Sequence, residues 1–312
     1  MSNNNKIFKN LDEQIQILLD KGLIINDVDH AKEILLKENY FFISGYRHLF
    51  MKSKKQTSFI EGTTFDELYA MLIFDRRMRN IFFKWILVIE NNIKSILSYQ
   101  LSKKYGFKEK DYLNPKNFTV DNMKTRQVHD ILNKVKRQIR VNGNQHAATY
   151  HYIANYGYVP MWILVKVLSF GLISEFYGIL KTEDQLKIAE LYNLDIETLS
   201  CYLTILANYR NICAHEEVLY EHRTQRSIPD TKYHRNLNID LIDDEYAYGK
   251  NDIYAVIIIM KQLLLDTEFR DLINEVSYEV DILNGKVSSV PLNNILNRCG
   301  FPDNWKDISD LD

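Results

Sequence analysis

Proline and glycine are scarce in this chain of 312 residues, with 5 and 11 copies respectively. Both residues are typical of turns, so their scarcity favours long helices over an architecture of short strands and turns. Cysteine is also rare, and the three copies have neither metal-ligand spacing nor a disulfide framework, which favours a reducing, cytoplasmic setting. These cysteines are Cys201, Cys213 and Cys299.

Long apolar runs are absent as well. The first residues, MSNNNKIFKN, contain no apolar segment of the kind found in signal peptides, and no uninterrupted apolar run approaches about 18 residues. We therefore expect no membrane partner. The net charge is −2, so a nucleic-acid surface would have to be local rather than a property of the whole chain.

Helical patterns dominate what is present. Thr64 and Glu67 form a capping box, and no proline or glycine follows before Gly106, which predicts a helix of about forty residues. Further helices are expected over 11–21, 121–140, 159–180 and from Asp195 onward, whereas Gly143 to Gly157 reads as an aromatic loop. With no block of strand periodicity, the sequence predicts an all-α protein.

An arginine interrupts the apolar stripe of the helix that follows Asp195. Leu199, Leu203 and Leu206 define the stripe, and its next turn brings Arg210 where a core residue is expected. Glu90 interrupts the stripe of the long helix in the same way. A buried single charge is costly unless it is paired, so we predict that Glu90 and Arg210 meet. The alternative is that Glu90 lies in water at the edge of its stripe.

His215 follows Arg210 by five residues, roughly 140° around an ideal helix, so the two side chains do not share one face. They can act on one target only if the helix end distorts or if another helix or chain completes the site. Histidine takes and gives protons near neutral pH, and arginine fits phosphate oxygens. Together they suit cleavage of RNA by its own 2′-hydroxyl, which DNA lacks. The alternative is a capped helix end with a buried, hydrogen-bonded histidine.

A local basic surface is predicted over 121–158. The helix over 121–140 has many cations and few acids, and aromatic residues follow it. Its candidate RNA contacts are Lys134, Arg137, Arg140, Tyr150 and His151. A solvated helix face and tyrosines that merely pack down the loop are the alternatives.

The segment Arg210-Asn-Ile-Cys-Ala-His215 resembles the R-x4-H motif of the HEPN ribonuclease superfamily, in the form typical of Abi-like (AbiD/AbiF) abortive-infection proteins. Other segments are also similar to this family, and they occur in the expected order along the chain. They are Ser44-Gly45-Tyr46-Arg47, Phe74-Asp75-Arg76, Trp162 with Leu168-Ser169-Phe170-Gly171, and Gly300-Phe301-Pro302-Asp303-Asn304-Trp305. Family members often continue with a second His and Leu-Trp-Asn-Arg, whereas Glu216 to Arg223 depart from that pattern.

The resemblance implies a HEPN-type helical bundle with additional N-terminal helices and a small C-terminal tail. The corresponding regions are 1–62, 63–285 with an insertion over 121–158, and 286–312. It implies a homodimer whose motifs face each other, with Arg210, Asn211 and His215 catalytic and Glu90 supporting. No metal or other cofactor is expected.

RNA is the partner that the resemblance implies, as substrate and as a structured small non-coding RNA. This adds Tyr46, Arg47, Arg76 and Arg79 to the predicted RNA contacts, and no DNA is expected. Three readings follow: an anti-phage, metal-independent endoribonuclease, an RNA-binding module in which cleavage is absent or latent, and a protein–protein scaffold of a toxin–antitoxin pair.

Overall fold

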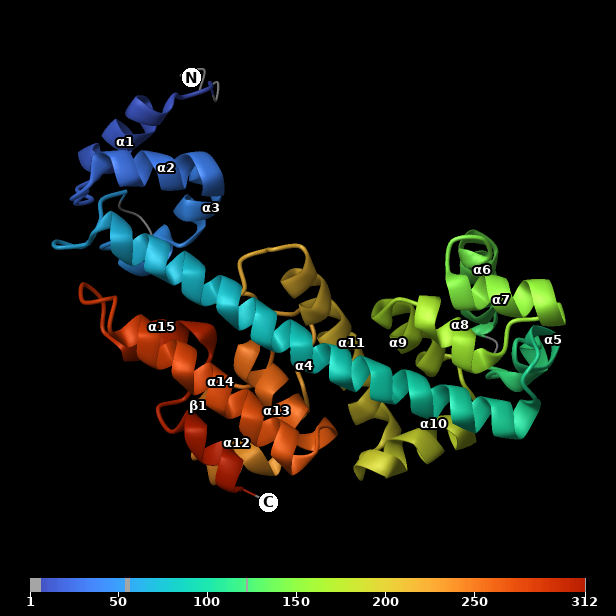
Figure 1. Cartoon of the computed structure of the whole chain (residues 1–312). Helices are drawn as coiled ribbons and strands as arrows, with labels where there is room; N and C mark the ends of the chain where they lie inside the picture. The colour runs from blue at the N-terminus through green and yellow to red at the C-terminus, as the bar shows by residue number, and fades with distance from the viewer. Residues whose placement is uncertain (1–6, 54–56, 122, 312) are drawn as a thin grey trace.

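One helix runs through the whole molecule. The computed structural model describes residues 7–53, 57–121 and 123–311, and its longest element is α4, Phe65–Tyr105. Thr64 and Glu67 cap its start reciprocally and Gly106, with a φ of 97°, follows its end, as predicted. With 41 residues, α4 spans about 60 Å. Figure 1 shows it crossing the molecule from the N-terminal helices to the α5–α8 region.

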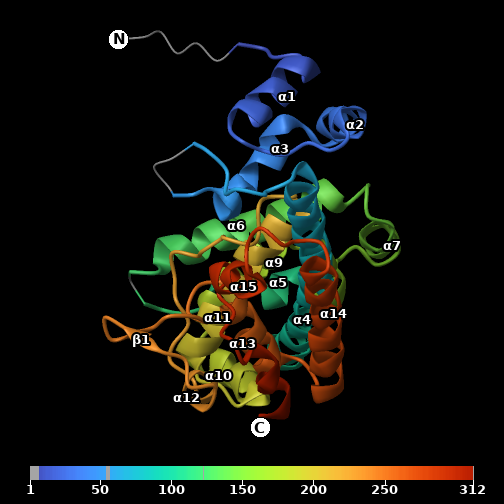
Figure 2. The same ribbon diagram turned by 90° about the vertical axis from the view of Figure 1, so that its left-hand side faces the viewer.

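Short helices form the two ends of the molecule. Before α4 come α1 Leu11–Asp20, α2 Val28–Glu38, α3 Tyr40–Gly45 and the 3-10 helix Arg47–Phe50. After α4 in the chain come α5 Glu109–Tyr112, the 3-10 turn Pro115–Asn117, α6 Thr125–Asn142, α7 Ala147–Tyr156, α8 Met161–Val167, α9 Phe170–Gly178, α10 Thr182–Ala189 and the 3-10 turn Glu190–Tyr192. In both views α1–α3 form a group apart from the main bundle (Figures 1 and 2).

The second half of the chain returns along α4. Its elements are α11 Ile196–Ala214, α12 Lys232–Asn236, β1 Leu241–Ile242, β2 Glu245–Tyr246, α13 Ile253–Leu263, α14 Asp266–Asn284, α15 Leu292–Cys299 and the 3-10 helix Trp305–Asp310. Helices α8, α11 and α14 pack directly on α4, and α9 packs on α11. One continuous apolar core includes residues from 1–62, 63–285 and 286–312, the three regions predicted from sequence.

The all-α prediction is confirmed. In the described part of the chain, regular strand is limited to the antiparallel pair β1–β2, joined by Asp243 and Asp244, whose φ values of 50° and 65° suit a tight two-residue turn. No helix there is long and apolar enough to cross a membrane.

Two sequence-based boundaries were wrong. The segment 143–157 contains the helix α7 rather than a loop: His146 caps its start, and its end is marked by Gly157 in the left-handed region. Gly143 follows the end of α6 and Gly157 follows the end of α7, so neither glycine interrupts a helix. The helix predicted over 159–180 is divided into α8 and α9, because Ser169 adopts extended backbone and caps α9 through the Leu172 N–H.

Candidate functional site

The Arg-Asn-Ile-Cys-Ala-His segment occupies the last turn of α11. Asp195 caps the start of this helix by accepting from the Thr198 N–H at 2.8 Å. At the other end, the His215 N–H still bonds to the Asn211 carbonyl, and the chain then turns at Glu216, which has a φ of 56°. His215 and Asn211 are exposed at the helix end, while the Arg210 side chain is 30% exposed.

Arg210 and Glu90 meet, as the interrupted stripes predicted. Arg210 Nε lies 3.7 Å from Glu90 Oε2, and the Glu90 side chain is buried. This separation is an ion-pair distance but is too long for a hydrogen bond, and both atoms are buried without a hydrogen-bond partner among the described residues. Glu90 therefore attracts Arg210 without fixing it.

Lys94 is the residue that holds the Glu90 carboxylate. Its Nζ lies 2.6 Å from Oε1, one turn further along α4, and both side chains are largely buried. Arg210 also lies over the ring of Phe83, whose centroid is 5.3 Å from the guanidinium carbon. Sequence analysis missed Lys94, although its spacing of four from Glu90 is that of a helical ion pair.

A second charged network fixes the segment that follows His215. The Asp75 carboxylate pairs with Arg79 and accepts from the Leu219 N–H at 3.1 Å and the Tyr220 N–H at 2.8 Å. The Tyr46 hydroxyl donates to Asp75 at 2.9 Å. Burial raises the pKa of Asp75, and Arg79 and the donated hydrogen bonds oppose this rise. The network ties the backbone just after His215 to both α4 and the end of α3.

Gly45 allows the same region to close tightly. A Cβ at this position would lie 3.2 Å from Val218 Cγ2, and the Tyr220 hydroxyl lies 3.4 Å from the Gly45 carbonyl oxygen. The Ser-Gly-Tyr-Arg segment singled out in the sequence is therefore packed against the segment that follows the Arg-x4-His motif. Any larger residue at position 45 would push the Val218 side chain away by a few tenths of an ångström, so glycine suits this close approach.

Two of the predicted RNA contacts are corrected by the structure. Tyr46 and Arg79 are buried at 2% and 4% exposure, and their polar groups serve the Asp75 network, because Arg79 also donates to the Glu217 carbonyl at 3.1 Å. Neither side chain lies on a surface that RNA could contact. Arg76 is partly exposed and forms a two-pronged pair with Glu38, at 3.0 and 2.5 Å. Arg47 is also partly exposed.

The remaining predicted RNA contacts lie on the surface of α6 and α7. Arg137 and Arg140 are exposed, whereas Lys134 is paired with Glu175 at 2.7 Å. Tyr150 is exposed, and His151 Nδ1 lies 3.1 Å from the Asn155 side-chain amide. These residues belong to the end of α4 opposite α1–α3, so the structure does not bring them together with Arg47 (Figure 1).

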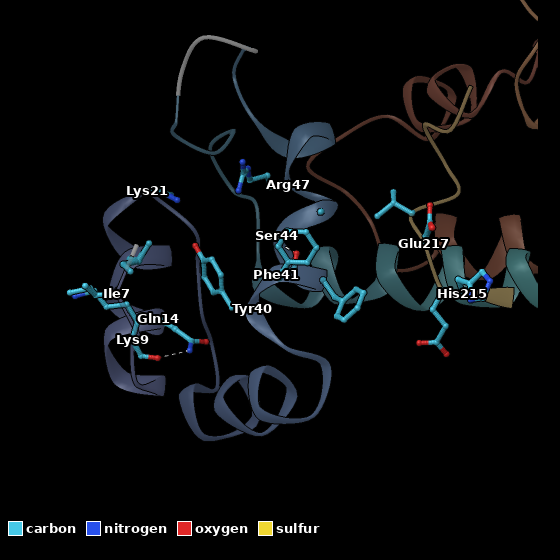
Figure 3. A pocket seen from close by; sticks show the side chains of 15 residues that line it. Ile7, Lys9, Gln14, Lys21, Tyr40, Phe41, Ser44, Arg47, His215 and Glu217 are labelled. Atoms are coloured by element: carbon cyan, nitrogen blue, oxygen red, sulfur yellow. Dashed lines mark hydrogen bonds between the residues drawn. The ribbon is translucent and has the colours of Figure 1, made fainter. Parts of the chain in front are cut away.

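His215 lines a groove, whereas Arg210 lies against Glu90 and Phe83 on α4. The groove has a volume of about 1070 Å³ and lies between the N-terminal helices and residues 215–218. Figure 3 shows Tyr40, Phe41 and Arg47 on one side and His215 with Glu217 on the other. Within one chain, Arg210 and His215 thus point to different surroundings, as their five-residue offset predicted. Sequence analysis did not find the groove, because its walls come from segments far apart in the chain.

Cys213 lies within the motif, and His222 lies shortly after it in the chain. Cys213 is buried, and burial raises the pKa of its thiol to about 12, so it is a neutral core residue. The described residues include no group of three or more His, Cys, Asp or Glu side chains suited to a metal. His222, which sequence analysis did not select, lies 2.7 Å from the Asn208 amide oxygen on α11, and its burial lowers its pKa.

The fold and the site define an all-helical protein with an Arg-Asn-x-Cys-Ala-His segment at the exposed end of a core helix. A model of the Abi-like protein family matches residues 33–221, more than half of the chain. The chain belongs to the Abi-like protein family. No curated protein and no solved structure matches the chain. The match includes the motif and the Asp75 network, but α1 and the resemblance noted over 300–305 lie outside it.

Proposed function

We propose that this protein is an abortive-infection factor that cleaves RNA through Arg210, Asn211 and His215. The observation that carries the proposal is the state of Arg210: a partly exposed guanidinium, close to a buried carboxylate, whose Nε has no hydrogen-bond partner among the described residues. Such a group can turn toward a phosphate. Asn211 and His215 are exposed on the same helix end, where a substrate can reach them.

The proposed reaction uses the RNA's own nucleophile. The 2′-hydroxyl attacks the adjacent phosphorus, the bond to the 5′-oxygen breaks, and a 2′,3′-cyclic phosphate and a 5′-hydroxyl are formed. His215 moves protons between these oxygens, and Arg210 stabilises the charge on the phosphate oxygens. Asn211, between them on the last turn of α11, positions the reacting groups. Within one chain His215 lines the groove while Arg210 contacts α4, which supports a site completed by a second copy.

Product analysis tests this proposal. The protein is incubated with RNA in EDTA, and the ends of the products are identified. We expect cyclic-phosphate ends with the wild type, and at least a hundredfold slower cleavage by His215→Ala and by Arg210→Ala. Cleavage that persists in both variants would overturn the assignment. If two copies form the site, the specific activity also rises with protein concentration in the range where dimers form.

A non-cleaving RNA-binding module is the second candidate function. The observation that favours it is the position of Arg137, Arg140 and Tyr150, exposed at the far end of α4 and separate from the motif. A surface there could hold a structured RNA without presenting it to His215. This function predicts tight binding of RNA that stays intact under every activating condition.

The protein–protein scaffold of a toxin–antitoxin pair makes a different prediction: Arg210→Ala leaves growth arrest unchanged.

A further inference from the structure

The groove beside His215 carries an inference about the substrate. One wall consists of residues from α1 and α3 and of Arg47, which follows α3, and the other consists of residues 215–218 (Figure 3). Phe41 and Phe42 on the first wall are 76% and 43% exposed, with ring centroids 6.0 Å apart. Neighbouring large aromatic side chains left this exposed indicate a binding surface.

The charges of the groove are divided between its walls. Lys21 and Arg47 belong to the wall with the phenylalanines, and neither forms an ion pair with the described residues, whereas Lys9 pairs with Glu13 at 2.9 Å. Glu216 and Glu217 belong to the wall of His215. An anionic chain in this groove would therefore place its charges along the first wall, away from Glu216 and Glu217.

We propose that this groove binds a short single-stranded segment of the substrate RNA and leads it to His215. The ring of Phe41 stacks a base, Phe42 supports it, and Arg47 and Lys21 contact the backbone phosphates. Exposed aromatic rings beside cations without carboxylate partners are the combination by which proteins bind single strands of nucleic acid. A duplex keeps its bases stacked and paired, and so has no free base face to offer Phe41. The inference rests on the proposed cleavage function and specifies its substrate.

The Asp75 network gives the groove its shape. It fixes Leu219 and Tyr220 by backbone hydrogen bonds and fixes Tyr46, next to Arg47, through the hydroxyl. Both walls are thus anchored to one buried carboxylate on α4, and the distance between them is set by the fold. The α1 part of the first wall, with Lys21 just beyond the helix, lies outside the family match over residues 33–221.

Equilibrium binding tests the proposal in a chain that cannot cleave. A fluorescent single strand of about ten nucleotides and a duplex of the same sequence are titrated into His215→Ala protein. We expect the single strand to bind more tightly. In this background, Phe41→Ala weakens its binding about tenfold, and Phe41→Tyr, which keeps the ring, stays within about twofold. Arg47→Gln reduces the slope of log Kd against log salt by about 0.7.

Matched controls lie on α14, away from the groove. Tyr278 and Arg270 are exposed there, and Tyr278→Ala and Arg270→Gln should leave binding unchanged. Equal binding by Phe41→Ala and its parent overturns the proposal, as does a Phe41→Ala variant that loses self-association instead, because the groove is then a contact between copies. If the wild type cleaves RNA but Phe41→Ala leaves KM unaltered, only the groove assignment fails. If single strands bind through Phe41 but nothing is cleaved, only the cleavage function fails.

Discussion

Arg210 Nε and Glu90 Oε2 lie 3.7 Å apart, while the other oxygen of Glu90 holds Lys94 Nζ at 2.6 Å. Glu90 is therefore shared between Lys94, which is hydrogen-bonded to it, and Arg210, which lies beyond hydrogen-bond distance. The buried carboxylate needs a cation to offset its desolvation, and the short contact to Lys94 supplies it. If Arg210 moves away from Glu90, the carboxylate therefore keeps Lys94 as its cationic partner.

This sharing predicts unequal effects of two substitutions. Glu90→Gln leaves Lys94 buried without its partner, and we expect a loss of about 3 kcal/mol in the free energy of unfolding. Arg210→Gln removes a partly exposed cation at a longer distance and should cost less than about 1 kcal/mol. Urea denaturation measures both. The double variant Glu90→Gln with Lys94→Met should recover most of the loss. Equal losses for the two single variants would contradict this division of roles.

The Asp75 network predicts a local effect after the motif. Asp75→Asn removes the charge that compensates buried Arg79 and weakens acceptance from Leu219 and Tyr220, so we expect a loss of about 3–5 kcal/mol. Amide hydrogen exchange gives the specific readout: protection at these two amides should fall by more than the global change accounts for. Tyr46→Phe removes one neutral donor and should cost only about 1–2 kcal/mol.

Local rules predicted the part of the site that depends on local geometry. The capping box at Thr64 and the absence of Gly and Pro before Gly106 were sufficient for α4. Two charges that interrupt two apolar stripes were sufficient to pair Glu90 with Arg210, because a buried charge requires a counterion. The same reasoning, continued by one turn to Lys94, would have found the third member.

Contacts between distant segments were beyond local rules. Tyr46 and Arg79 are polar enough to be expected on the surface, and they are buried because other segments supply their partners. The Tyr46 hydroxyl donates to Asp75 and accepts from Arg79, and Arg79 also donates to the Glu217 carbonyl, 138 positions further along the chain. The groove at His215 depends on the same long-range packing. The segment 143–157, predicted to be an aromatic loop, contains α7 over 147–156, and no glycine lies inside that helix.

The pair of Arg76 and Glu38 predicts a dependence of stability on pH. The hydrogen bonds from Arg76 are the main cause that lowers the pKa of Glu38 in the folded chain. A carboxyl group with a lowered folded-state pKa stabilises the fold above its unfolded value, about 4.3, and loses this contribution as the pH falls through the folded-state pKa. We expect Glu38→Gln to cost about 1 kcal/mol at pH 7, after allowance for screening at the partly exposed Arg76.

The measurement is a series of urea denaturation curves for the wild type and Glu38→Gln from pH 7 downward. The difference between the two proteins should shrink as the pH approaches the folded-state pKa from above. High salt at pH 7 should also reduce it, because the pair is partly accessible to solvent. A difference that stays constant with pH would show that the hydrogen bonds, and not the charge of Glu38, account for the loss.

The cations of α6 predict a salt-dependent contribution to RNA binding that is separate from the groove. Arg137 and Arg140 are exposed, whereas Lys134 is held by Glu175 at 2.7 Å. If this face contacts RNA phosphates, replacing both arginines by glutamine reduces the slope of log Kd against log salt by about 1.4–1.8. Lys134→Gln should reduce the slope by less than the roughly 0.7–0.9 expected for one phosphate contact, because Lys134 must leave Glu175 before it can bind a phosphate.

The groove variant Arg47→Gln makes the two surfaces separable. A structured RNA that binds α6 should respond to the double arginine variant and not to Arg47→Gln, and a short single strand in the groove should show the opposite response. Arg270→Gln on α14 removes one exposed cation elsewhere and should change neither slope. If Arg270→Gln and the α6 variant reduce the slope equally per cation, binding is a non-specific effect of net charge, and α6 has no defined role in it. Distinct responses would instead mean that one chain holds two RNA segments at opposite ends of α4 and presents only one of them to His215. Helix α4 is about 60 Å long, so the two segments would be well separated.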